Sequence, residues 1–284
     1  MKEILHILKH TLLDTINLLP FLLIAFFIIE LIEHKFSKKT QKLISKSGNF
    51  GPIIGSLLGL FPQCGFSVIA TNLYITRIIS LGTLISIYLS TSDEMLPILL
   101  SEKAPLNIII SILIIKFVVG FTAGCIIDLL ISKKKNIKEE VSKICESEHC
   151  DCEHGIIKST IIHTLKTIIF IYIATFIVNV LFHYVGEQYI SKLFMKNSLI
   201  APFITSLIGL IPNCAASITL TELFLKGAIS FGAMISGLLT GSGISILVLF
   251  KSNKNIKENL KILLTIYLIG VAIGIITEIV LPLI

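Results

Sequence analysis

Long apolar stretches make up most of the chain, and short polar segments separate them. Four stretches approach or exceed the roughly twenty residues that a helix needs to cross a bilayer. They span about 11–31, 106–131, 157–180 and 262–283. Two further apolar regions, 51–103 and 201–250, are interrupted by Pro, Gly and polar residues. The pattern predicts an all-α polytopic membrane protein that lies in a lipid bilayer.

The two interrupted regions are copies of each other at a constant offset of 150 residues. Residues 51–65 read GPIIGSLLGLFPQCG, and residues 201–215 read APFITSLIGLIPNCA. The copies align without a gap over about fifty residues. Internal duplication in a very apolar chain is typical of membrane transporters. Their binding site lies where both repeats carry Pro, Gly and polar residues.

Lysines gather in three polar segments, 34–46, 133–143 and 251–261. Positively charged loops stay in the cytoplasm, so we place all three segments on that side. Each interrupted region must then begin on one side of the membrane and end on the other, although it is long enough for two crossings. We expect the first part of each region to be a re-entrant hairpin, because Pro and Gly at its tip interrupt the helix.

Three crossings in each half make the two halves inverted relative to each other, with about ten helical segments in total. Residues 1–132 form the first membrane repeat, residues 133–156 form a cytoplasmic linker, and residues 157–284 form the second repeat. The alternative is eight straight helices in a parallel repeat, which would place residues 35–46 outside the cell.

The composition agrees with a membrane protein, because 54% of the residues are hydrophobic and only 15% are charged. The mean hydropathy is +0.91. The net charge of +6 comes from lysines at membrane edges, so we expect no nucleic-acid binding. No phosphate-binding loop motif is present, so energy must come from a gradient or a partner. We expect a multi-pass protein of the cytoplasmic membrane and leave its oligomeric state open.

Polar residues interrupt the crossing that follows each hairpin. Residues 90–97 read STSDEMLP and residues 240–245 read TGSGIS, with Ser92 and Ser242 at equivalent positions. A charged side chain at the centre of a membrane helix costs about 2.5–3.5 kcal/mol. Asp93 and Glu94 are therefore the leading candidates for ligands of a transported metal, assisted by Ser92 and Ser242.

The two acids need a positive charge to neutralise them, and the source of that charge indicates what the site binds. Arg77 and Lys103 lie at the ends of this segment, and we expect no Lys or Arg at the depth of the acids. A bound cation or a proton would then neutralise Asp93 and Glu94. The acids match Gly243 and Ile244 of the second copy, so the charge belongs to the first copy alone.

The hairpin tips supply further candidates. Gln63 and Asn213 offer amide oxygens, and Cys64 and Cys214 offer thiols. Oxygen suits Mn²⁺ or Mg²⁺, whereas thiolate suits softer ions. The alternative, held equally open, is that these residues cap the hairpin ends and pack in tight turns.

The linker between the halves is rich in residues that bind metals. Its candidate ligands are Cys145, His149, Cys150, Cys152 and His154. Imidazole and thiolate favour Zn²⁺ or similar ions, which suggests a cytoplasmic sensor or delivery site outside the transport path. The alternative is a polar linker whose cysteines are incidental. We expect no disulfides and no cofactor other than the transported ion and this loop-bound metal.

The segments GLFPQCG and GLIPNCA, with STSDEMLP after the first, resemble those of the ten-transmembrane heavy-metal exporter family. Its members are labelled arsenic efflux proteins or manganese transporters. The resemblance runs over nearly the whole chain and implies export of a metal or metalloid from a bacterial cytoplasm. It carries over to Pro62, Gln63, Cys64, Asp93 and Glu94, and to Pro212, Asn213 and Cys214. The second tip ends in Ala215 rather than Gly, which leaves its turn geometry open.

Three functions remain in view. The first is a secondary transporter that exports a divalent cation, with Mn²⁺ as the first candidate and H⁺ as the coupling ion. The second is export of arsenite or an organic arsenical through Cys64 and Cys214. The third, a membrane enzyme, is disfavoured because no predicted span places a His near the acids.

Overall fold

The computed structural model describes residues 50–61, 64–92, 95–131, 156–185 and 200–280, and scattered positions between 8 and 27. Every secondary-structure element in these ranges is a helix. The first half contains α3 (Gly51–Gly59), α4 (Cys64–Ile75), α5 (Leu81–Ser90), α6 (Met95–Ser101) and α7 (Leu106–Ile131). The second contains α9 (Ile156–Val185), α11 (Ala201–Gly209), α12 (Cys214–Leu225), α13 (Phe231–Thr240), α14 (Ser245–Ser252) and α15 (Ile256–Val280).

Several helical stretches are long and apolar enough to cross a membrane, which confirms the predicted all-α polytopic class. They are Leu106–Leu130, Thr160–Ile177, Phe231–Ser252 and Ile256–Val280. The last begins six residues before the predicted stretch, which started at residue 262. The backbone N–H of Glu258 donates to the side-chain oxygen of Asn255 at 3.3 Å, and this bond holds the polar first turn in the helix.

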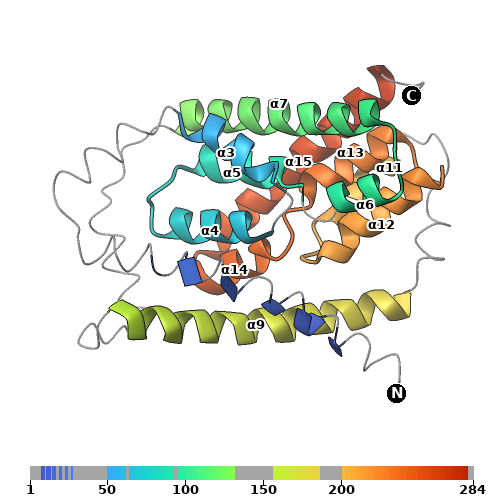
Figure 1. Cartoon of the computed structure of the whole chain (residues 1–284). Coiled ribbons are helices and arrows are strands. Elements are labelled where there is room, and N and C mark those ends of the chain that lie inside the picture. The colour runs from blue at the N-terminus through green and yellow to red at the C-terminus, as the bar shows by residue number, and fades with distance from the viewer. Residues whose placement is uncertain are drawn as a thin grey trace.

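Two nearly buried helices form the interior of the bundle. Every residue of α13 is buried, as are residues 82–90 of α5. Figure 1 shows α7 along one side of the molecule and α9 along the opposite side, with the shorter helices between them. α7 and α15 expose large apolar side chains such as Ile114 and Leu268. Apolar side chains on the outside and many polar side chains in the interior are the arrangement expected of a protein in a lipid bilayer.

The helices of the second half begin 150 residues after those of the first, from α3 and α11 through to α7 and α15. Their packing corresponds as well. α5 packs against α3 and α7, and α13 packs against α11 and α15. Across the halves, α4 packs on α14 and α12 packs on α6. The halves therefore share one local architecture, whereas their inverted orientation in a membrane stays a prediction.

Small residues let the outer helices approach the inner ones closely. A Cβ atom added to Gly120 of α7 would lie 2.7 Å from the backbone oxygen of Ser86, and one added to Gly124 would lie 2.7 Å from that of Gly82. Gly270 and Gly274 repeat this spacing on α15, where they pack against α13. Small residues four apart are a common interface between membrane helices.

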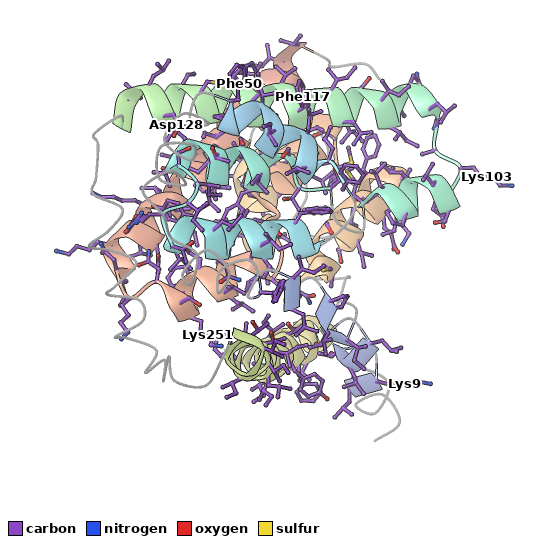
Figure 2. The ribbon with its side chains drawn as sticks, turned by 60° about the vertical axis from the view of Figure 1, so that its left-hand side comes forward. Lys9, Phe50, Lys103, Phe117, Asp128 and Lys251 are labelled. Atoms are coloured by element: carbon purple, nitrogen blue, oxygen red, sulfur yellow. The ribbon has the colours of Figure 1, made fainter. Side chains whose placement is uncertain are left out.

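Polar contacts fasten the ends of these helices. Asp128, near the end of α7, accepts hydrogen bonds from the backbone N–H of Gly82 at 2.8 Å and from the hydroxyl of Ser80 at 2.6 Å. The carboxylate therefore sits at the N-terminus of α5, where helix dipoles favour negative charge. Figure 2 shows Asp128 at the end of α7 that lies away from Lys103.

We predict that Gly120→Val destabilises the protein by about 1–3 kcal/mol, because its side chain would press on the backbone of α5, which cannot yield as a side chain can. Thermal unfolding of the purified protein in detergent measures the effect. Val118→Leu is the matched control, since Val118 lies on the same helix with 46% of its surface exposed. Equal melting temperatures for the two variants would contradict the proposed close packing.

Candidate functional site

Both crossings predicted to be interrupted are broken in the structure at equivalent positions. α5 ends at Ser90 and α6 begins at Met95, while α13 ends at Thr240 and α14 begins at Ser245. The described residues in both breaks are largely buried, with Ser92 only 1% exposed and Ser242 fully enclosed. Non-helical backbone at membrane depth is tolerated only where protein buries it or where it lines a cavity.

The second break depends on its glycines. Gly243 has a φ of +58°, a left-handed conformation that residues with a Cβ atom rarely adopt. The backbone N–H of Ser242 donates to the carbonyl of Thr240 at 2.9 Å. A continuing helix would send this N–H to the carbonyl of Leu238 instead. The break therefore releases the Leu238 carbonyl for another donor.

Among the residues that the structure describes, the hydroxyl of Ser242 finds no hydrogen-bond partner, although it is completely buried. An unsatisfied buried polar group costs about 1–3 kcal/mol. In the part of the chain that the structure describes, the same is true only of the Asn72 amide nitrogen and the Thr175 hydroxyl, which lie on α4 and α9. Ser242 thus keeps a free donor and acceptor at the break where we predicted a ligand.

At the first break, the polar groups of Ser92 form hydrogen bonds with other parts of the chain. The backbone N–H of Ser92 donates to the carbonyl of Gly59, at the end of α3, at 3.1 Å. The hydroxyl of Ser92 donates to the Ser90 carbonyl at 3.4 Å. The predicted ligands Asp93, Glu94 and Gln63 lie outside the described residues, as does the side chain of Cys64. Their roles therefore stay predictions.

The second hairpin tip lies against its own broken helix. Cys214 carries a half-buried thiol outside any disulfide, and it packs on a cluster made of Val68, Ile171, Ile244 and Val248. Asn213 caps α12, because its side-chain oxygen accepts from the backbone N–H of Ala215 at 3.2 Å. This bond supports the capping alternative for Asn213, and its part in ligand binding stays a prediction.

A lysine lies at the depth where we expected no basic residue, and that expectation was wrong. Lys116 is in the middle of α7, is 1% exposed and donates from Nζ to the carbonyl oxygen of Leu238 at 2.5 Å. A single Lys barely lowers the mean hydropathy of an apolar span, so hydropathy alone does not reveal this charge. Lys116 therefore joins the candidate site as a cationic member.

Lys116 lies level with the first break and bonds to the end of the helix before the second. One turn further along α7, Gly120 packs against Ser86 and Ser90, and Gly124 packs against Gly82 and Ser86, so α7 runs antiparallel to α5. Residues four apart lie on the same face of a helix. Lys116 is therefore level with the chain just beyond Ser90, at the first break, while its ammonium reaches the end of α13 at the second.

The linker ligands Cys145, His149, Cys150, Cys152 and His154 lie outside the described residues. Within the described ranges, no three His, Cys, Asp or Glu side chains gather as a metal site.

A family profile described as "Putative, 10TM heavy-metal exporter" (ArsP_2) matches residues 6–186 and 169–284, nearly the whole chain. The chain belongs to this family. No curated protein and no solved structure matches it. Membership confirms the resemblance drawn from the hairpin tips and the first break, and establishes a multi-pass membrane protein of a heavy-metal exporter family.

We predict that Ser242→Ala leaves the melting temperature of this family member unchanged or slightly higher, because it removes an unsatisfied hydroxyl. The same change should weaken metal transport by raising KM. Ser236→Ala is the matched control on the same crossing. Its hydroxyl donates to the Pro202 carbonyl at 2.8 Å and lies 2.5 Å from the hydroxyl of Ser206. Its loss should cost about 1–3 kcal/mol. Equal destabilisation by both variants would contradict a ligand role for Ser242.

Proposed function

We propose that this family member is a secondary transporter that exports a divalent metal cation, with Mn²⁺ as its substrate, across the cytoplasmic membrane by alternating access. The observation that carries the proposal is the pair of buried breaks at equivalent positions of the two halves. The second break leaves the Ser242 hydroxyl unpartnered. In transporters, the ends of broken helices and unwound carbonyls bind ions near the middle of the membrane.

The chemistry of the predicted ligands favours a hard cation. Asp93 and Glu94 would bind the metal through carboxylate oxygens, with Ser92, Ser242, Gln63 and Asn213 supplying further oxygens. Carboxylate, carbonyl and hydroxyl oxygens suit Mn²⁺ better than soft ions. Proton coupling through Asp93 or Glu94 would supply the energy, and we propose no catalytic reaction.

Inverted halves are part of the proposal, and the course of the long helices supports them. Figure 1 shows α7 and α15 running in opposite directions across the bundle. These helices occupy equivalent places in the two halves, since α7 packs on α5 and α15 packs on α13. The end of α7 and the beginning of α15 adjoin lysine-rich segments 133–143 and 251–261, which we place in the cytoplasm.

An ion pair would hold the cytoplasmic side closed in the conformation seen here. Arg77, just after α4, donates to both carboxylate oxygens of Glu258 on α15, at 2.8 and 3.1 Å. The hydroxyl of Tyr74 also donates to Glu258. The positions that match Arg77 and Glu258 are Gly227 and Ile108, so the repeat provides no counterpart. An exporter loads from the cytoplasm, and loading would require this pair to separate.

Export of arsenite is a second candidate, favoured by one observation. The thiol of Cys214 packs beside the second break, and thiolates bind soft ions. In that case Cys64 and Cys214 would hold the metalloid, and the acids would serve proton coupling.

Uptake into inside-out vesicles separates the two candidates. Asp93→Asn should reduce Mn²⁺ uptake at least tenfold, because it removes a charged oxygen ligand, whereas Cys64→Ser and Cys214→Ser should leave it nearly unchanged. Cys125→Ser is the thiol control, since Cys125 is a free cysteine on α7. Wild-type vesicles that accumulate arsenite but not Mn²⁺, and lose this uptake in Cys214→Ser, would overturn the manganese proposal.

A further inference from the structure

The buried ammonium of Lys116 is placed where a transporter of this kind would hold a cation. Its Nζ lies 2.5 Å from the carbonyl oxygen of Leu238, which the break at Gly241 leaves without a helical donor. The C-terminal end of a helix carries partial negative charge and attracts cations. In membrane transporters, half-helix C-termini coordinate the transported cation.

Packing does not explain why this residue is a lysine. Ile266 occupies the equivalent position on α15, is fully buried, and shows that an apolar side chain fills this place in the fold. Ionisable residues within membrane helices are expensive and mark functional sites. The lysine is therefore specific to the half whose break carries the acidic pair in its sequence.

We propose that Lys116 is a resident cation of the transport site, which holds the carbonyl end of α13 while the site is empty and competes with the entering divalent cation. This inference rests on the proposed function, because it assumes a positively charged substrate. When the metal arrives, the ammonium leaves the Leu238 carbonyl, and when the metal departs, the ammonium returns. The competition weakens metal binding and speeds release. An ion site must bind weakly enough for the ion to leave.

The test compares neutral and charged replacements of Lys116 in the full-length protein. Lys116→Met and Lys116→Gln remove the charge, and Gln keeps a donor for the Leu238 carbonyl if Met impairs folding. Lys116→Arg keeps the charge. Ile266→Met is the matched control at the equivalent position of the second half. The measurements are Mn²⁺ binding to purified protein, KM and kcat for Mn²⁺ in vesicles, and the melting temperature.

We expect both neutral variants to bind Mn²⁺ about tenfold or more tightly than the wild type, with KM and kcat falling together because release becomes slow. Lys116→Arg and Ile266→Met should keep the wild-type affinity or weaken it. A purely structural lysine would instead lower the melting temperature and the transport rate with KM unchanged.

Two failures can be told apart. If the wild type transports Mn²⁺ and folded Lys116→Gln shows no gain in affinity, the resident-cation inference is overturned while the proposed function stands. If the wild type neither binds nor transports Mn²⁺, the proposed function is wrong, and the inference that rests on it is wrong too.

Discussion

The absence of water inside a bilayer is the constraint on which this structure depends. Every backbone N–H and carbonyl in the hydrocarbon layer must find a partner within the protein. A helix can break there only if other parts of the protein enclose the break. α5 and α13 meet this condition because they are nearly buried and because α7 and α15 cover them through glycine contacts. The close packing and the interrupted helices are therefore two parts of one solution.

The two halves share one architecture, but the backbone groups at their breaks form hydrogen bonds with different partners. In the first half, the N–H of Ser92 bonds to the end of α3. In the second half, the Leu238 carbonyl near the end of α13 accepts a hydrogen bond from the ammonium of Lys116, which comes from the other half. The buried ammonium of Lys116 and the Arg77–Glu258 pair lack an equivalent in the repeat sequence. Ser242 matches Ser92 in sequence, but the Ser92 hydroxyl has a hydrogen-bond partner and the Ser242 hydroxyl has none among the described residues. A duplicated scaffold with unequal chemistry suits a transporter that moves its substrate in one direction.

Much of the fold could be read from the sequence because the duplication fixes the positions of Pro, Gly and polar residues. The interruptions at Pro62 and Pro212, and those after Ser90 and Thr240, correspond to the observed helix ends. Contacts between distant segments could not be read in this way. That Leu238 faces Lys116 depends on how α13 and α7 meet across the halves, which no local pattern encodes. The sequence does contain Lys116, but the mean hydropathy of its span is so high that it hides the charge. For Asn213, the sequence left helix capping and ligand binding equally open, because residue spacing alone does not distinguish them.

In the proposed arrangement, the opposed orientation of the halves would bring the two breaks to a common depth, and topology mapping tests this orientation. Lys39→Cys and Lys192→Cys are introduced singly into a protein whose native cysteines are replaced, and a membrane-impermeant thiol reagent is applied to intact cells. Position 192 should react in intact cells, whereas position 39 should react only after the cells are opened. Protection of both positions in intact cells would contradict the inverted arrangement and the transport site built on it.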